Sequence, residues 1–222
     1  MNPIFKNPLV KLLTINDLAT KSFQSKMIPK KSIPILIIDD NEFVYEDEMK
    51  NIGYDIRCIQ DLEDTKMAVD YQIIISDIKG VGKKISNNEG VGLIYELKKL
   101  YPYKQYGVYT GNKISIELTT FLDGIEIIPK RFDKDDWNSL LYDLIKRFVD
   151  PKTLWIKLRD ILLEEGVSMF DLTIFEHRYV DAVINKNSNF ENLFDKKYKI
   201  PDDLKTILLN MTSTAITSSI GM

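Results

Sequence analysis

Five polar residues stand at the ends of short apolar runs, and their types suit the chemistry of phosphoryl groups. Asp39 and Asp40 follow the run ILII, and Asp77 follows IIIS. Thr110 ends the run QYGVYT, and Lys130 follows IIP. In a parallel α/β sheet, ligands bind outside the carboxyl ends of the strands. We therefore expect these five side chains to converge on one site.

The three carboxylates in this set predict a bound cation. Carboxylates held close together repel one another, so a cluster of them persists in a folded protein when a cation compensates it. Mg²⁺ is the expected ion, because it prefers oxygen ligands and combines one or two carboxylates with waters and a phosphate. A lysine can pair with one phosphoryl oxygen, and a threonine hydroxyl can donate to another. Phosphoryl transfer depends mainly on such positioning and charge neutralisation.

Four of these residues also have a purely structural explanation. Asp39 and Asp40 could cap a helix, Asp77 could cap a strand end, and Thr110 could belong to a turn. Their order along the chain, at the ends of the first, third, fourth and fifth apolar runs, favours a phosphorylation site over separate structural roles.

The elements that must position these residues follow an alternating pattern. Apolar runs at residues 33–39, 54–59, 71–76, 105–110 and 125–129 are typical of strands buried on both faces. Amphipathic segments between and after them predict helices at residues 42–53, 62–69, 90–100, 114–122 and 133–149. Five strands alternating with five helices predict an α/β fold with a doubly wound, five-stranded parallel sheet.

Residues 33–150 resemble the receiver domain of response regulators in two-component signalling. The resemblance rests on the acidic pair in LIIDDNE, the aspartate in IIISDI, the threonine in VYTG and the lysine in IIPKRF. It implies a flavodoxin-like fold that works as a switch and is not an enzyme. It also implies a sensor histidine kinase or a phosphotransfer protein as the partner that donates the phosphoryl group.

The resemblance assigns a role to each residue of the site. Asp77 would be the phosphoacceptor, and Thr110 and Lys130 would bind the phosphoryl group. The implied Mg²⁺ ligands are Asp39, Asp40, Asp77 and the backbone carbonyl of Lys79.

Two features depart from the family pattern. The loop between Asp77 and Gly90 is longer than usual. Its Lys83 and Lys84 could attract phosphate or a partner, but we interpret them as solvated residues of a flexible loop. Ile127 occupies the position at which the family carries an aromatic switch residue. A switch that uses the usual tyrosine is therefore not expected.

Composition agrees with a soluble cytoplasmic protein. The chain has 222 residues, of which 44% are hydrophobic, enough for one full core and a smaller second unit. The single cysteine, Cys58, excludes internal disulfides and Cys-rich metal sites. The single histidine, His177, is expected to have a structural role or to lie on the surface. No apolar run of about 18 residues is present, so no membrane segment is predicted.

Charge divides the chain into three regions. Residues 1–32 form a basic N-terminal extension with six lysines and one aspartate, whereas residues 33–150 carry 15 basic and 22 acidic residues. The extension could contact nucleic acid, but we expect it to lie against the acidic middle region.

The pattern of residues 151–222 predicts an all-helical output or dimerisation region. Asp150 and Pro151 form a good helix start, and three or four helical segments follow, the last with a fraying end. Nine basic and ten acidic residues and the lack of a basic recognition helix do not favour DNA binding. The apolar helix faces suit a homodimer or a downstream protein partner, or they pack on one another.

Two other functions remain open at this level. A transcription factor with a divergent helical output domain would bind DNA in a salt-dependent way. An Mg²⁺-dependent phosphohydrolase of similar topology would use an aspartyl intermediate, but its expected DxD motif does not match DDNE.

Overall fold

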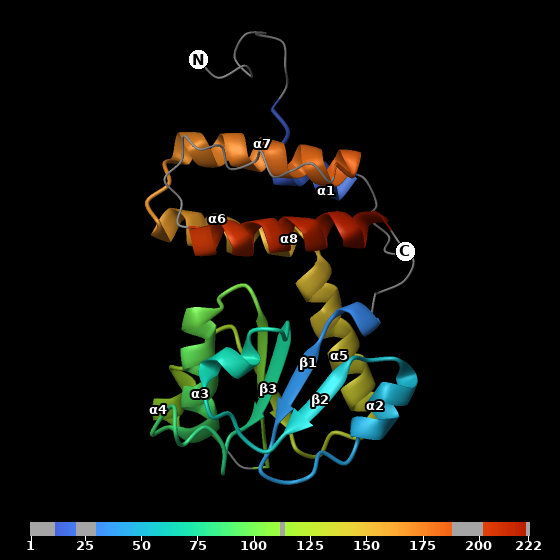
Figure 1. The fold of residues 1–222 in the computed structure, drawn as a ribbon, viewed down its shortest axis with the longest axis vertical. Helices are drawn as coiled ribbons and strands as arrows, with labels where there is room; N and C mark the ends of the chain where they lie inside the picture. Colours follow the sequence, from blue (N-terminus) through green and yellow to red (C-terminus); the bar gives the residue numbers. More distant parts are fainter. Residues whose placement is uncertain (1–11, 21–29, 112–113, 188–201, 221–222) are drawn as a thin grey trace. The chain divides into compact units, whose positions relative to one another are not determined.

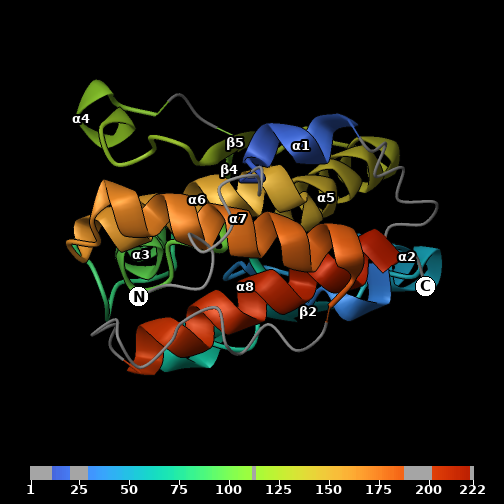
Figure 2. The ribbon, with the colours of Figure 1, turned by 90° about the horizontal axis from the view of Figure 1, so that it is seen from above.

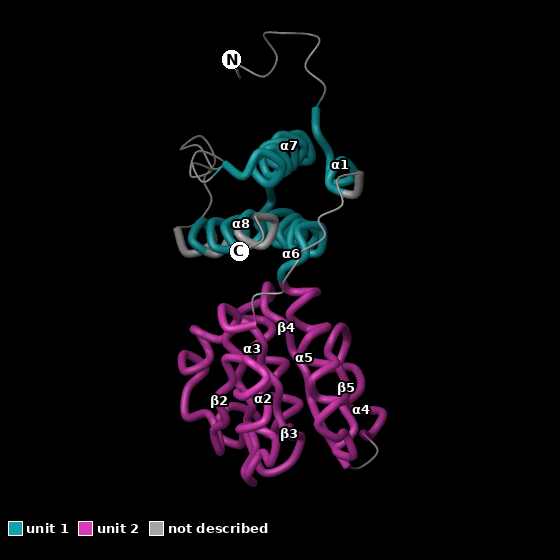
Figure 3. The backbone as a smooth tube through the Cα atoms, turned by 90° about the vertical axis from the view of Figure 1, so that its right-hand side faces the viewer, with its two compact units in different colours: residues 1–27, 149–222 teal, residues 28–148 magenta. Residues whose placement is uncertain are grey.

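The computed structural model describes residues 12–20, 30–111, 114–187 and 202–220. The chain divides into two compact units, which are coloured separately in Figure 3. Residues 28–148 form an α/β unit, and residues 1–27 together with 149–222 form a helical unit. Among the described helices, none has the length and apolar character that crossing a membrane requires.

The α/β unit is built on a five-stranded parallel sheet (Figure 1). Its strands are β1 (Ile35–Ile38), β2 (Ile56–Ile59), β3 (Ile73–Asp77), β4 (Gln105–Thr110) and β5 (Glu126–Pro129). They lie in the order β2-β1-β3-β4-β5. The predicted doubly wound sheet is therefore confirmed, and all five strands fall within or next to the apolar runs that predicted them.

Both faces of the sheet are covered, as the continuous apolar runs predicted. All four residues of β1 are fully buried, and successive side chains leave a strand on opposite faces. Leu36 and Ile38 join a core cluster with Leu93, Ile94 and Leu97 of helix α3 (Glu89–Leu100). Figure 1 shows α3 and α4 (Ile116–Thr119) on one side of the sheet, and α2 (Glu46–Ile52) and α5 (Lys134–Val149) on the other.

The connection between β2 and β3 differs from its prediction. In place of a helix over residues 62–69, the chain forms one short 3₁₀ helix, η3 (Thr65–Ala68). Asp64 caps it by accepting a hydrogen bond from the Lys66 N–H at 2.9 Å. The cap at Asp64 places the start of the helix at Thr65, so residues 62–64 lie outside it.

The helical unit consists of α1 (Ile15–Thr20), α6 (Pro151–Glu164), α7 (Met169–Asn185) and α8 (Asp202–Ile220). Helices α6, α7 and α8 pack on one another, and α1 packs on α6 and α7 (Figure 2). The predicted helix start is present, because Asp150 accepts a hydrogen bond from the Thr153 N–H at 2.7 Å. The end of α8, which was expected to fray, continues as helix to Ile220.

The described part of the N-terminal region also differs from its prediction. Residues 12–20 belong to the helical unit, in which α1 packs on α6 and α7, and do not form a separate extension. His177 accepts a hydrogen bond from the Leu13 N–H at 3.0 Å, and Glu176 accepts one from the Ile15 N–H at 2.7 Å. N–H groups at the start of a helix have no carbonyl of a preceding helical turn to bond to, and these two side chains supply acceptors for them. The structural role expected for His177 is confirmed.

Candidate metal and phosphoryl site

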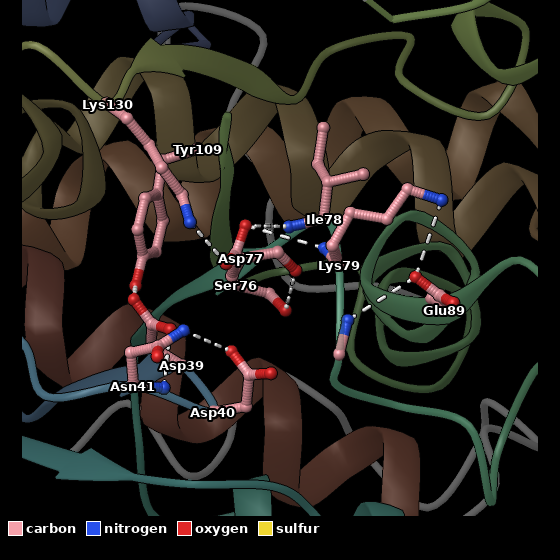
Figure 4. Close-up of polar contacts among 11 residues, drawn as sticks. Asp39, Asp40, Asn41, Ser76, Asp77, Ile78, Lys79, Glu89, Tyr109 and Lys130 are labelled. Atoms are coloured by element: carbon pink, nitrogen blue, oxygen red, sulfur yellow. Dashed lines mark hydrogen bonds and ion pairs between the residues drawn. The ribbon is translucent and has the colours of Figure 1, made fainter. Parts of the chain in front are cut away.

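Asp77 is held at the carboxyl end of β3 by three donors (Figure 4). The residue is only 3% exposed. Its Oδ1 accepts hydrogen bonds from the backbone N–H groups of Ile78, at 2.6 Å, and Lys79, at 3.4 Å. Its Oδ2 lies 2.5 Å from the ammonium nitrogen of Lys130, which follows β5. This ion pair places Lys130 next to the expected phosphoacceptor, and its predicted contact with a phosphoryl oxygen stays a prediction.

Asp39 and Asp40 complete an acidic cluster with Asp77. One carboxylate oxygen from each of the three residues lies within 4.8 Å of the others. Asp39 is buried and accepts the backbone N–H of Asn41 at 2.9 Å. Asp40 is exposed and accepts the side-chain amide of the same Asn41 at 2.7 Å. The ends of β1 and β3 therefore bring together the three carboxylates that the sequence predicted as metal ligands.

Two glycines allow the backbone to approach these carboxylates closely. Gly80 has a φ of +86°, and a Cβ placed there would lie 2.0 Å from Oδ2 of Asp40. A Cβ at Gly90 would lie 1.7 Å from the backbone oxygen of Asp77. The N–H of Gly90 also donates to the carbonyl of Ile78 at 3.1 Å, which fixes the start of α3 against the end of β3. A side chain at Gly90 would collide with the backbone of Asp77, and one at Gly80 would meet the Asp40 carboxylate in a backbone conformation that L side chains rarely adopt.

The sequence did not reveal the role of Tyr109. Its hydroxyl donates a hydrogen bond to Oδ2 of Asp39. Tyr109 lies on β4 and Asp39 follows β1, so the side chain reaches past β3, which separates the two strands. Its ring packs edge-on against Trp137, with 5.8 Å between the ring centroids. Burial, followed by the hydrogen bond to Asp39, raises the pKa of the Tyr109 hydroxyl, so the hydroxyl stays protonated and remains a donor.

Thr110 ends β4, the strand next to β3, and Lys79 follows Asp77 just after the end of β3. Thr110 is half-buried at the end of β4, and its carbonyl accepts the Lys130 N–H at 3.0 Å. This bond holds the ends of β4 and β5 together. The Lys79 side chain points to Glu89, with 3.5 Å between the charged atoms. The phosphoryl contact of Thr110 and metal ligation by the Lys79 carbonyl stay predictions.

The loop after Asp77 is packed, contrary to its interpretation as a flexible solvated loop. Val81 is fully buried in it. The N–H of Gly82 donates to the Asp61 carboxylate at 2.7 Å, and Lys84 forms an ion pair with Glu63. Lys83 is exposed, as predicted. The loop is therefore held against the segment that follows β2.

The donor set of the site fits Mg²⁺. Three carboxylates from two strand ends supply hard oxygen ligands, and the missing Cβ of Gly80 leaves Asp40 room beside the loop. Asp39 and Asp77 are buried and Asp40 is exposed, so a bound ion would have carboxylate ligands toward the protein and room for waters or a phosphate toward solvent.

Comparison with known proteins found similarity at the level of structure. No family model matches the sequence, and no curated protein matches it. A CheY-like response regulator receiver domain protein from Methanospirillum hungatei JF-1 is 22% identical, covering 52% of this chain and 95% of its own, with a TM-score of 0.42. The beryllofluoride-activated NtrC4 receiver domain dimer is 16% identical, covering 52% and 98%, with a TM-score of 0.43. NtrX from Brucella abortus is 20% identical, covering 53% and 27%, with a TM-score of 0.44.

The strand order decides the fold. An all-parallel sheet in the order β2-β1-β3-β4-β5 is the flavodoxin-like arrangement, which CheY shares, and its ligands bind at the carboxyl ends of the strands. The α/β unit has a flavodoxin-like receiver fold. Its function has to be argued from the residues of the site, because one fold supports many activities.

Proposed function

We propose that the chain is a phosphorylation-dependent signalling switch in which Asp77 accepts a phosphoryl group. The observation that carries this proposal is the pairing of Lys130 with Asp77, 2.5 Å apart, beside the carboxylates of Asp39 and Asp40. A nucleophilic oxygen, a cation for the phosphoryl group and an acidic cluster suited to a metal thus lie at one edge of the sheet.

The residues of the site divide the work of the reaction. A carboxylate oxygen of Asp77 attacks phosphorus, and the bond from phosphorus to the leaving group breaks as the acyl phosphate forms. Lys130 moves from the Asp77 carboxylate to a phosphoryl oxygen, and the Thr110 hydroxyl donates to another. Asp39, Asp40, Asp77 and the Lys79 carbonyl would hold Mg²⁺, which would supply positive charge to neutralise the transferred group.

The proposed partners follow from this role. A sensor histidine kinase or a phosphotransfer protein would supply the phosphoryl group in the cytoplasm. The helical region from residue 151 would pass the signal on by binding a second copy of the chain or a downstream protein. DNA binding is not favoured, because basic and acidic residues nearly balance in that region.

Intact-mass measurement after incubation with acetyl phosphate and Mg²⁺ tests the proposal. We expect one added phosphoryl group on the unmodified chain, dependence on Mg²⁺, and none on Asp77→Asn. Asp123→Asn, which changes an exposed aspartate outside the cluster, is the matched control and should be labelled normally. Equal labelling of the Asp77→Asn variant would place the acceptor elsewhere and overturn the proposal.

A further inference from the structure

Tyr109 lies outside the predicted set, yet its side chain bonds directly to a carboxylate of the acidic cluster from another strand. Its hydroxyl donates to Oδ2 of Asp39, whereas Oδ1 of Asp39 accepts the Asn41 N–H at 2.9 Å. Both oxygens of Asp39 are therefore held by protein donors from different elements. Figure 4 shows the phenol and the Asn41 backbone meeting this carboxylate away from Asp40 and Asp77.

Two donors on one carboxylate fix the direction in which its remaining lone pairs point. A carboxylate oxygen has two lone pairs, so Oδ2 can accept the phenol hydrogen bond and still bind a cation. Hydrogen bonds from outside the ligand set commonly orient metal-binding carboxylates in this way. The ring of Tyr109 is itself immobilised, because it is 4% exposed and packs against the buried Trp137.

The distance that must be spanned explains why the residue is a tyrosine. Asp39 lies two strands away from Tyr109, because β3 runs between β1 and β4. Two inter-strand spacings amount to about 10 Å, which only a long side chain can bridge. A phenylalanine would fill the same space, but it would leave Oδ2 of Asp39 without its donor.

From this geometry we infer that Tyr109 is a positioning residue for the metal site, which orients Asp39 toward the cation bound by the acidic cluster. The inference rests on the proposed function, since it concerns the same Mg²⁺ site. It predicts that loss of the hydroxyl alone weakens Mg²⁺ binding, although Tyr109 does not touch the metal. Orienting partners of this kind change metal affinity by about 10- to 100-fold when they are removed.

Calorimetric titration with MgCl₂ of the full chain tests the inference. We expect the dissociation constant of Tyr109→Phe to rise at least about tenfold. Tyr106→Phe is the matched control. Tyr106 lies on the same strand with the same 4% exposure. Its hydroxyl donates to the backbone carbonyls of Leu97, at 2.8 Å, and Tyr101, at 2.9 Å, and not to a carboxylate of the acidic cluster. Its removal should leave Mg²⁺ affinity unchanged.

A spectroscopic measurement on the unmodified chain keeps the test independent of the variant's folding. In protein labelled with ¹³C at the tyrosine ζ-carbon, Mg²⁺ should shift the Tyr109 resonance, because its acceptor then shares charge with the ion. The Tyr106 resonance should not move.

Each outcome decides a different statement. An unchanged Mg²⁺ affinity in Tyr109→Phe, or a Tyr109 resonance that does not shift at saturating Mg²⁺, would overturn the positioning role. A tighter affinity in Tyr109→Phe would also overturn it, by making the phenol a competitor of the metal. Absence of Mg²⁺ binding to the unmodified chain would overturn the metal site of the proposed function, and the inference with it.

Discussion

Replacing Lys130 with methionine should destabilise the α/β unit in the absence of metal. Removing one partner of a buried ion pair costs about 3 to 5 kcal/mol, because the other charge is left uncompensated. The Lys130 side chain is 39% exposed, and Asp77 keeps its two backbone N–H donors. Solvent and these donors reduce the cost, so we expect a loss of about 2 kcal/mol of unfolding free energy in EDTA.

Mg²⁺ should remove much of that loss, since both Lys130 and the metal ion compensate the same carboxylates. If the cost falls from about 2 to below about 1 kcal/mol in saturating Mg²⁺, the variant gains more than 1 kcal/mol from the ion relative to the unmodified chain. A gain of 1.4 kcal/mol corresponds to a tenfold tighter dissociation constant. The variant should therefore bind Mg²⁺ several-fold more tightly while losing the group that we propose contacts the phosphoryl.

Urea unfolding of both proteins, in EDTA and across a Mg²⁺ titration at constant ionic strength, measures these quantities. Lys50→Met is the control, because Lys50 pairs with Glu46 on α2 at 2.6 Å with its side chain 48% exposed. Such a surface pair contributes less than about 0.5 kcal/mol, and its loss should not depend on Mg²⁺. An equal cost of Lys130→Met with and without Mg²⁺ would refute the reasoning, since it would mean that the ion does not compensate Asp77.

Two further predictions concern other charged groups. Asp40→Asn should raise the melting temperature of the metal-free chain, because it relieves repulsion with Asp39. Mg²⁺ at 100 times its dissociation constant should add roughly 2.7 kcal/mol to the stability of the unmodified chain, and the variant should lose most of this gain. A lower metal-free melting temperature of the variant in thermal melts would contradict this prediction. Burial lowers the pKa of Lys104 to about 8 from 10.5, so the unfolded chain binds more protons between these values, and stability should rise by about 1 kcal/mol from pH 7 to pH 9. Lys104→Met should abolish that rise in urea unfolding, and persistence of the rise would assign it to other groups.

The strands and the acidic cluster could be predicted because both depend on local sequence. A run such as ILII has no polar residue to face water, so it has to form a strand covered on both faces, and β1 is fully buried. A residue that directly follows such a strand lies at the sheet's carboxyl edge, which brings Asp39, Asp40 and Asp77 together. Alternation with helices predicted parallel crossovers but not the strand order, because several doubly wound orders satisfy it; the flavodoxin-like order was implied by the resemblance to receiver domains.

Contacts that depend on side-chain reach or on distant partners could not be predicted in the same way. The pattern of Gln105–Thr110 indicates a strand, but it does not say that the Tyr109 hydroxyl extends past β3 to Asp39. The basic charge of the N-terminal region suggested an acidic surface, whereas backbone N–H groups near Leu13 bond to His177 and Glu176, about 160 residues later in the chain. Charge sets only a weak, screened preference between exposed surfaces, while unpaired backbone donors at a helix start require specific acceptors. The packing partner of α1 is therefore set by hydrogen bonds to its backbone donors and could not be predicted from net charge.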